Sequence, residues 1–432
     1  MHPDLSFEQA PPVSVPYRFF LAAPWFGVAA GLLLAWLGEG AWASRWSPGT
    51  LALTHLLVVG YMLQAMAGAL FQFVPVAVGG NVWRPRLVAA IVQPLLLVAA
   101  PVLAAAFLGS WSAGFLAAGP LFALAVGIFV VAVGSALWRT AAQGPTLRAL
   151  RSAVAALAVT VALGVTLAES LGRGLDLPFV EMVDVHAAWG LGGWALLLLA
   201  GVSFHVVPMF QLTPPYPPRL AAALPPAMLA ALLLWSWQLG SAKPAWQEAA
   251  YFLGLTVAAA FAAVTLRLQF RRRRKIPDPT LLFFRLAMAS LLAAAASAVA
   301  LALIPGLAAY PRSPVWIGVL VLAGTFVSAI NGMLYRIVPF INWLDLQRLA
   351  GTRVGVPNVR EMIPEKAVFG QLRLHFAAVA LLLAAVLLPP LTRAAAALFA
   401  ASCTWLGWNL IGAARRYREF RDRIAAGGPG RE

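Results

Sequence analysis

The chain has 432 residues, of which 62% are hydrophobic and 11% are charged, and its formal net charge is +16. Soluble globular domains are about half apolar and about one quarter charged. This composition therefore excludes a soluble enzyme and a disordered chain, and the single cysteine, Cys403, excludes a disulfide scaffold. The length is sufficient for about a dozen membrane spans of roughly 20 residues joined by short loops.

Twelve apolar stretches predict an all-α, polytopic membrane bundle of twelve transmembrane helices. A proline-bearing leader precedes the first stretch without a clear small-residue cleavage site, so we expect a retained helix rather than a signal peptide. The stretches cover approximately residues 19–38, 51–78, 87–108, 114–138, 152–170, 185–210, 220–240, 247–270, 281–304, 314–341, 369–389 and 393–414.

The basic residues are distributed unevenly among the loops. Of the 31 Lys and Arg, five fall in odd-numbered connections, and the other 26 lie in the tails, in even-numbered connections or at the adjoining helix ends. The densest groups are residues 271–275 and 415–418. Positive residues mark the cytoplasmic side, so both termini are predicted to be cytoplasmic, in a bacterial inner membrane. The charge then indicates topology and contact with anionic membrane lipids, and no nucleic-acid partner is expected.

Three segments share a pattern of a glycine, an aromatic residue three positions later and a terminal Val-Pro. Their glycines are Gly68, Gly201 and Gly332, which are 133 and 131 positions apart. Glycine allows helices to approach closely, and the terminal proline is expected to end helices 2, 6 and 10. We predict one membrane domain of three pseudo-repeats with four helices each. The units cover approximately 1–140, 141–275 and 276–414, followed by a short cytoplasmic tail, 415–432.

Two histidines occupy similar positions in the first two units. His55 lies 20 residues before the Val-Pro proline of helix 2, and His186 lies 22 residues before that of helix 6, so both are expected at outer helix ends. Imidazole is a normal haem ligand, and bundle cores are normal haem sites. We predict that His55 and His186 are axial ligands to the iron of haem b. The alternative is a pair of interfacial histidines hydrogen-bonded to backbone or loops.

Other polar residues are weaker candidates. His205 is a weak metal-ligand candidate, because its equivalents in the other units are Gln72 and Arg336 and the position is simply polar near the interface. Arg336 either extends to the cytoplasmic interface or faces His205 or Gln72 at the centre of the bundle. His375 is expected at the cytoplasmic interface.

Acidic and amide side chains complete the candidate set. Glu181 and Asp184 precede His186 in an outer loop, where they either orient its ring nitrogen as outer-sphere partners or simply solvate the loop. Gln64 and Gln93 are predicted at mid-span, where they line a cavity or bond between helices.

The stretch from His55 to Leu87 resembles a helix–loop pattern of the C-family haem–copper oxidases and nitric-oxide reductases. It is also similar to the NnrS family of haem- and copper-containing membrane proteins linked to nitric-oxide stress. The architecture of twelve helices in three four-helix units resembles the catalytic subunit of haem–copper oxidases. The pattern consists of His55, Gly60, Gly68, Phe71, Val74-Pro75, Gly79-Gly80 and Arg86-Leu87, and it recurs from His186 to Leu220.

The ligand set departs from that family. The resemblance implies low-spin haem ligands on helices 2 and 10, and copper ligands on helices 6 and 7. Helix 10 (314–341) and helix 7 (220–240) contain no histidine, so only His55 carries over by position and a three-imidazole copper site is not expected.

The sequence therefore favours a haem-binding integral membrane protein with a redox or nitric-oxide-related role and a respiratory or cytochrome partner, without identifying catalytic residues. Two alternatives remain, a cofactor-free transporter or channel and an assembly partner of a respiratory complex.

Overall fold

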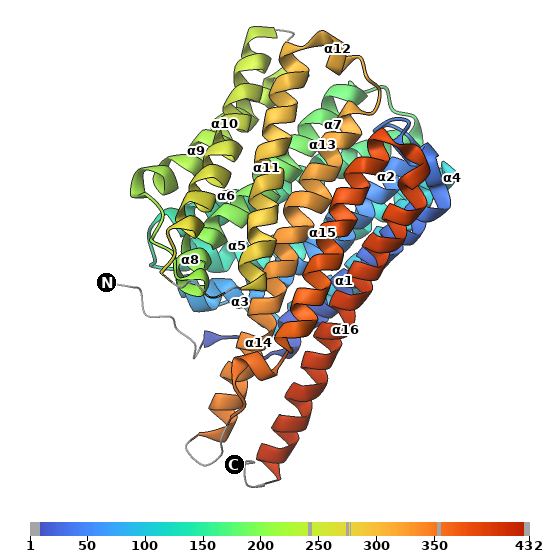
Figure 1. The fold of residues 1–432 in the computed structure, drawn as a ribbon. Helices are drawn as coiled ribbons and strands as arrows, with labels where there is room; N and C mark the ends of the chain where they lie inside the picture. The colour runs from blue at the N-terminus through green and yellow to red at the C-terminus, as the bar shows by residue number, and fades with distance from the viewer. Residues whose placement is uncertain (1–8, 241–243, 274–275, 277, 352–355, 427–432) are drawn as a thin grey trace.

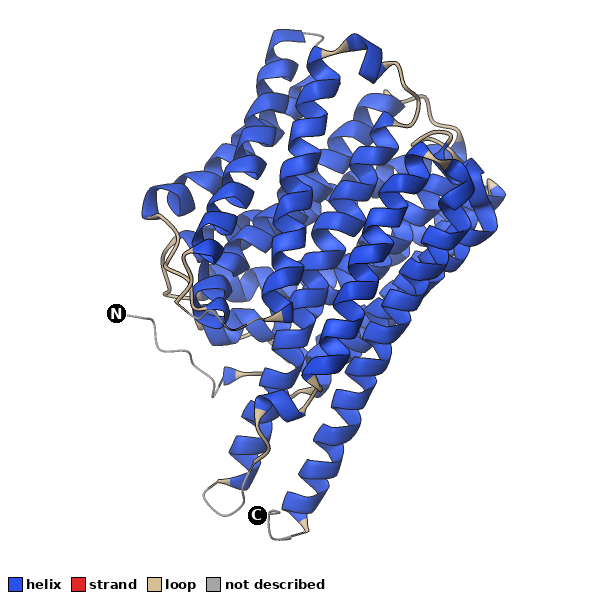
Figure 2. Ribbon diagram, viewed as in Figure 1, coloured by secondary structure: helices blue, strands red, loops and turns tan. Residues whose placement is uncertain are grey.

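The computed structural model describes residues 9–240, 244–273, 276, 278–351 and 356–426. Within them, twelve helices are long and apolar enough to cross a membrane, and no strand occurs (Figure 2). The chain is thus an all-α, multi-pass membrane protein, as its composition predicts. His2, Lys243, Arg274 and Lys275 lie outside the described residues.

The helical elements follow one another with short connections (Figure 1), and those labelled η are 3-10 or π segments. In chain order they are α1 (Ser14–Leu37), η2 (Gly38–Trp42), α2 (Pro48–His55), η3 (Leu56–Met62), α3 (Leu63–Val78), α4 (Pro85–Gly109), α5 (Ser112–Arg139), α6 (Pro145–Arg173), α7 (Phe179–Ala188), η4 (Trp189–Leu196), α8 (Leu197–Gln211), α9 (Pro218–Ser236), η5 (Trp237–Leu239), α10 (Pro244–Phe270), α11 (Pro279–Leu303), α12 (Pro305–Ala308), α13 (Ser313–Val319), η6 (Leu320–Val327), α14 (Ser328–Ala350), η7 (Val359–Glu361), α15 (Glu365–Leu387), η8 (Pro389–Leu391) and α16 (Thr392–Ala425).

Three composite spans form the inside of the bundle. Span 2 consists of α2, η3 and α3, span 6 of α7, η4 and α8, and span 10 of α13, η6 and α14. In each of these, 67% of the membrane-crossing window is buried, against 33% to 50% in the other nine candidate spans of the described chain. The three spans that carry the repeated motif are therefore the inner ones.

Each inner span contains a π-helical segment, and the three begin at Leu56, Trp189 and Leu320. Each start lies twelve residues before the repeat glycine of the same span. π-Helical segments are rare and concentrate at functional sites. Their recurrence at the spacing of the sequence motif is what a threefold repeat predicts.

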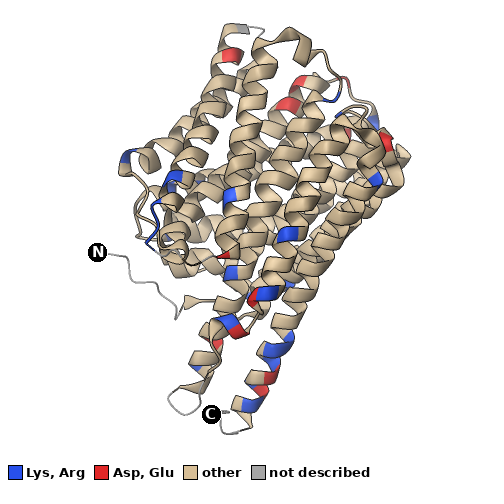
Figure 3. Ribbon diagram, in the orientation of Figure 1, with Lys and Arg blue, Asp and Glu red and all other residues tan. Residues whose placement is uncertain are grey.

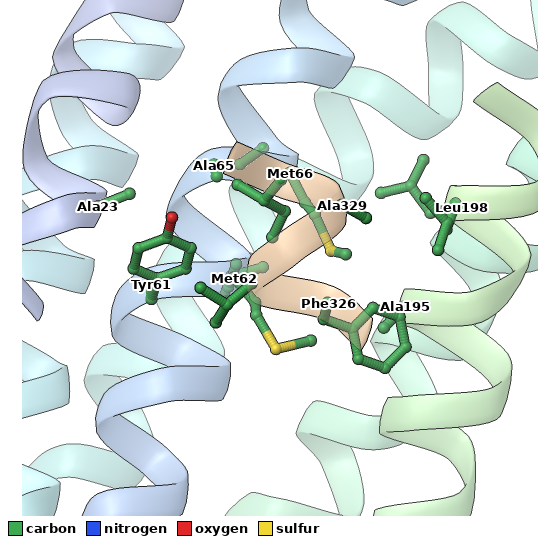
Figure 4. Packing of buried hydrophobic residues seen from close by; sticks show 14 of the residues in the cluster. Ala23, Tyr61, Met62, Ala65, Met66, Ala195, Leu198, Phe326 and Ala329 are labelled. Carbon is green, nitrogen blue, oxygen red and sulfur yellow. The ribbon is translucent and has the colours of Figure 1, made fainter. Parts of the chain in front are cut away.

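Positions one repeat apart in the sequence also meet in space. Met62 of span 2, Ala195 of span 6 and Phe326 of span 10 converge at the centre of the bundle (Figure 4), and each is at most 2% exposed. Dispersion contacts and the loss of apolar surface stabilise such a cluster. A second layer, three positions further along each span, consists of Ala65, Leu198 and Ala329.

The repeat glycines lie where inner and outer helices touch. A Cβ on Gly68 would lie 2.9 Å from the Cβ of Phe19, one on Gly201 would lie 2.8 Å from that of Ala149, and one on Gly332 would lie 2.9 Å from that of Phe283. These partners belong to α1, α6 and α11, which are spans 1, 5 and 9. The expectation that these glycines permit close helix packing is confirmed.

The expectation that the Val-Pro prolines end the inner spans is wrong. The helices continue beyond them, to Val78, Gln211 and Ala350. Proline removes one intrahelical hydrogen bond, and membrane helices tolerate that loss where neighbouring groups satisfy the freed carbonyl.

Two helices extend further than the apolar pattern indicates. α14 continues to Ala350 and α16 to Ala425, and both project beyond the rest of the bundle (Figure 1). The 34 residues of α16 span about 51 Å, well beyond a hydrocarbon core of about 30 Å. The Tyr417 hydroxyl donates to Asp345 at 2.6 Å and joins the two projections. They are rich in charge (Figure 3), so hydropathy alone does not reveal them.

Candidate functional site

His55 is held at the junction between α2 and η3. Its Nδ1 lies 2.7 Å from the carbonyl oxygen of Leu51, one helical turn earlier. The ring packs against Phe107 of α4, with ring centroids 4.9 Å apart and planes inclined by 30°. Because a carbonyl only accepts hydrogen bonds, Nδ1 carries the proton, and the Nε2 lone pair remains available.

His186 is held in the same way by a different helix. Its Nδ1 lies 3.0 Å from the carbonyl oxygen of Thr160 on α6. A Cβ on Gly164, one turn further along α6, would lie 3.0 Å from Cε1 of this ring. Thr160 therefore orients the imidazole, and the missing side chain of Gly164 makes room for it. Here too the proton is on Nδ1 and the Nε2 lone pair is available.

Both rings occupy corresponding places near the beginning of an inner span, His55 at the end of α2 and His186 within α7, although 131 residues separate them in the sequence. Both rings stay partly accessible on spans that are otherwise the most buried of the bundle. Neither Nε2 atom makes a hydrogen bond to any residue that the structure describes.

This donor set fits haem. A metal-ligating histidine normally donates its other ring N–H to a carbonyl or carboxylate, which fixes the tautomer and raises the basicity of the ligand nitrogen. The interfacial alternative shares the backbone bonds but assigns no role to the two Nε2 atoms. Over the described part of the chain, no three His, Cys, Asp or Glu side chains form a metal-binding group. Axial ligation of haem needs only two imidazoles.

Asp184 does not take the outer-sphere position suggested by its place two residues before His186. Its carboxylate pairs with Arg45 at 2.8 Å, and the Arg45 guanidinium lies over the Trp46 ring, 4.4 Å from its centroid. The hydrogen bond to His186 Nδ1 comes from Thr160 instead. Asp184 thus ties span 6 to the loop before span 2.

Arg336 is engaged at the start of α11. Its guanidinium is 2.5 Å from an oxygen of Asp278 and 3.1 Å from the hydroxyl of Thr280, and it lies over Phe210 at 5.9 Å. Asp278 also caps α11 by accepting from the Thr280 backbone N–H. Arg336 thus joins span 10 to the first turn of span 9. This contact agrees better with the predicted position at the cytoplasmic interface than with the position facing His205 or Gln72.

His205 and Gln72 lie near the Val-Pro ends of spans 6 and 2. The His205 ring contacts Phe73 edge-on at 5.9 Å, so it bridges the two inner spans. Gln72 is 9% exposed. These residues are far along their spans from His55 and His186, since 19 helical residues correspond to about 28 Å.

His375 is fully buried, so its expected interfacial position is wrong. α15 begins at Glu365, ten residues before it, which places His375 well inside the bundle. Asn331 Nδ2 lies 3.5 Å and Ser402 Oγ 3.3 Å from Nδ1, whereas Ser328 Oγ lies 2.9 Å from Nε2.

The directions of these bonds follow from their neighbours. Asn331 accepts from Tyr61 through its oxygen, so its NH₂ group donates to His375 Nδ1. The Nε2–H group then donates to the hydroxyl oxygen of Ser328, and that hydroxyl donates to the carbonyl of Ala323 at 3.2 Å. Both nitrogens of His375 are used, which makes it a structural residue and not a ligand.

The sequence does not reveal Phe107, Thr160 or Gly164 as site residues. They lie on α4 and α6, and a threonine and a glycine four positions apart in an apolar helix are unremarkable until the facing ring is known. Gln64 and Gln93, the two amides predicted at mid-span, are buried, with 0% and 8% exposure. Both polar side-chain atoms of Gln64 lack a hydrogen-bond partner among the described residues.

Comparison with known proteins does not assign the chain to a family. No model of a known protein family matches the sequence, and no curated protein matches it.

Proposed function

We propose that this protein binds haem b between spans 2 and 6, with His55 and His186 as axial ligands. The observation that carries the proposal is the pair of imidazoles, at corresponding places on two inner spans, whose Nδ1 atoms are bonded to carbonyls and whose Nε2 atoms have no described partner. Haem supplies one-electron redox chemistry when bound. The resemblance to haem–copper oxidases and the NnrS family supports a redox or nitric-oxide-related role, in a bacterial inner membrane and with a respiratory or cytochrome partner.

The surrounding residues would prepare the two ligands. The carbonyls of Leu51 and Thr160 keep each imidazole neutral at Nε2 and fix its rotation. Phe107 supports one face of the His55 ring, and Gly164 lets α6 approach the edge of the His186 ring. These contacts pre-organise the ligands and reduce the reorganisation that binding requires.

The packing at the centre of the bundle is relevant to the alternative function, a cofactor-free channel. Met62, Ala195 and Phe326 fill it with apolar side chains that are at most 2% exposed. A transported ion would have to replace its hydration with polar groups, and these residues offer none. This packing favours the haem proposal over a channel that runs along the centre.

The absorption spectrum of the purified protein tests the proposal. We expect a Soret band in the wild type, and its loss in both His55→Ala and His186→Ala. His205→Ala is the matched control, because it removes an imidazole from the same span as His186 but far from the site, and the band should remain. A colourless wild-type protein with full helical content would reject haem binding. Loss of the band in only one of the two variants would reject ligation by both histidines.

A further inference from the structure

A cavity lies on the other side of span 2, between α1, α2, α13, α15 and α16. Its volume is about 140 Å³, and it is separate from the site of His55 and His186. The deep walls are apolar and well packed, since Leu34, Leu322, Leu382 and Phe399 are each at most 9% exposed. A cavity of about 150 Å³ lined by aliphatic and aromatic side chains accepts one benzene ring. The size and lining therefore suit a single six-membered ring.

The cavity wall is open at Gly318 of α13. A Cβ at this position would meet no atom within 4 Å, although the residue lies on an inner span and lines the cavity. Glycine weakens a helix by about 1 kcal/mol relative to alanine, and no close helix contact accounts for it here. Its effect is to widen the cavity.

Thr54 supplies a hydroxyl without a described partner. Helical threonines commonly donate to the carbonyl four residues earlier, as Thr160, Thr256 and Thr404 do here. Thr54 lines the cavity and makes no hydrogen bond to any residue that the structure describes. Its hydroxyl is available to a ligand.

The mouth of the cavity is polar, and its positive charge is compensated by an ion pair. Arg45, with 43% of its side chain exposed, lines the cavity and is paired with Asp184 at 2.8 Å. Trp42 forms a fixed wall beside it, because its indole N–H donates to Thr392 at 2.6 Å. Since the guanidinium charge is already compensated, a neutral oxygen acceptor fits the mouth better than a second anion does.

We propose that this cavity binds a neutral six-membered ring carrying oxygen, of the phenol or quinone class. The ring occupies the apolar part, and its oxygen accepts from the Thr54 hydroxyl or the Arg45 guanidinium. The proposal does not depend on haem, because the cavity shares no lining residue with the histidine pair.

Equilibrium dialysis of the purified full-length protein with 2,6-dimethyl-1,4-benzoquinone tests it, after subtraction of uptake by protein-free micelles. We expect saturable binding at one site, weakened at least tenfold in Gly318→Leu. Gly127→Leu is the matched control, because Gly127 is an exposed helical glycine whose Cβ would also meet nothing within 4 Å. Its affinity should stay within twofold of the wild type. Equal affinity in the two leucine variants, or no saturable binding to the wild type, would overturn the proposal.

A second comparison tests the role of the oxygen. The hydrocarbon 1,3-dimethylbenzene should bind several-fold more weakly than the quinone, and the isosteric Thr54→Val variant should reduce that preference. Equal affinity of both rings for the wild type would overturn the assignment of an oxygen-bearing ligand. The dialysis measures ring binding directly and the Soret band measures haem, so failure of the haem proposal and failure of this one give different results.

Discussion

The two sides of span 2 show how one helix serves two chemically different regions. On the side of span 6, His55 and His186 each have one nitrogen bonded to a carbonyl and one without a described partner. On the side of spans 10 to 12, His375 has both nitrogens bonded, and an apolar cavity lies nearer the predicted outer end. Each region places histidine in a membrane interior, where an ionisable residue is costly.

The difference lies in hydrogen-bond satisfaction and burial rather than in residue type, since His375 is fully buried and the other two histidines are partly accessible. Buried polar atoms are nearly always satisfied, and the cluster around His375 obeys that rule by joining spans 2, 10, 11 and 12. The rings of His55 and His186 are partly accessible, and each forms a hydrogen bond through only one of its two nitrogens. A half-satisfied pair is expected where a ligand completes the site, so counting bonds separates a structural histidine from a candidate ligand.

The largest expected effect comes from filling the space beside His186. In Gly164→Leu, the new side chain would begin 3.0 Å from Cε1 of the ring and displace it from the Thr160 carbonyl. We expect haem content below about one tenth of the wild type, because a displacement of about 1 Å abolishes pre-organised ligation. Pyridine haemochrome analysis of the purified protein measures it.

Gly127→Leu adds the same atoms to the exposed face of the preceding helix and should retain full haem content. Full haem content in Gly164→Leu as well would show that the ring position does not matter, and would remove the distinction between the two sides of span 2.

A smaller effect, on stability alone, is expected from His375→Ala. The change leaves Asn331, Ser328 and Ser402 without their shared partner in the interior. An orphaned buried polar group costs about 1 to 3 kcal/mol, so the melting temperature should fall by several degrees. Haem content per folded molecule should not change. If haem is lost while the melting temperature is kept, His375 is a ligand and the bond-counting criterion fails.

Arg336→Leu is expected to destabilise the bundle by about 1 to 2 kcal/mol, without affecting either region beside span 2. The ion pair with Asp278 is partly exposed, with 29% and 17% of the side chains accessible, so solvent screens part of its energy. Loss of the bond to Thr280 adds to the effect. Thermal unfolding of Arg336→Leu, Asp278→Asn and the double variant measures the coupling. Additive effects in the double variant would show that the pair is not coupled.

The sequence predicts the fold well because apolar span length is a strong local property. All twelve spans occur among the described residues, and the repeat glycines lie at helix contacts. The charged ends of α14 and α16 are missed because helix formation there follows from mutual packing, such as the bond between Tyr417 and Asp345, and not from hydropathy.

The candidate site is predicted only in part, because its contacts join distant helices. Histidine scarcity and motif spacing single out His55 and His186. Whether a ring nitrogen is satisfied depends on groups of distant helices, such as a backbone carbonyl that any residue can supply (Thr160 for His186) or the hydroxyl of a common residue (Ser402 for His375). Asp184 lies two residues before His186 and therefore looks like its hydrogen-bond partner in the sequence. In the structure its carboxylate pairs with Arg45 instead.

The smallest expected effect, from Asp184→Asn, distinguishes these two candidate partners of His186. The ion pair with Arg45 has side chains that are 27% and 43% exposed, and such pairs contribute at most about 1 kcal/mol. If the Thr160 carbonyl orients the imidazole, the Soret maximum and the haem content should match the wild type, with only a slight fall in melting temperature. Difference spectroscopy at equal protein concentration measures both. A shifted Soret maximum or lower haem occupancy would show that the carboxylate reaches the histidine, and would place Arg45 at the boundary between the two regions as a shared residue.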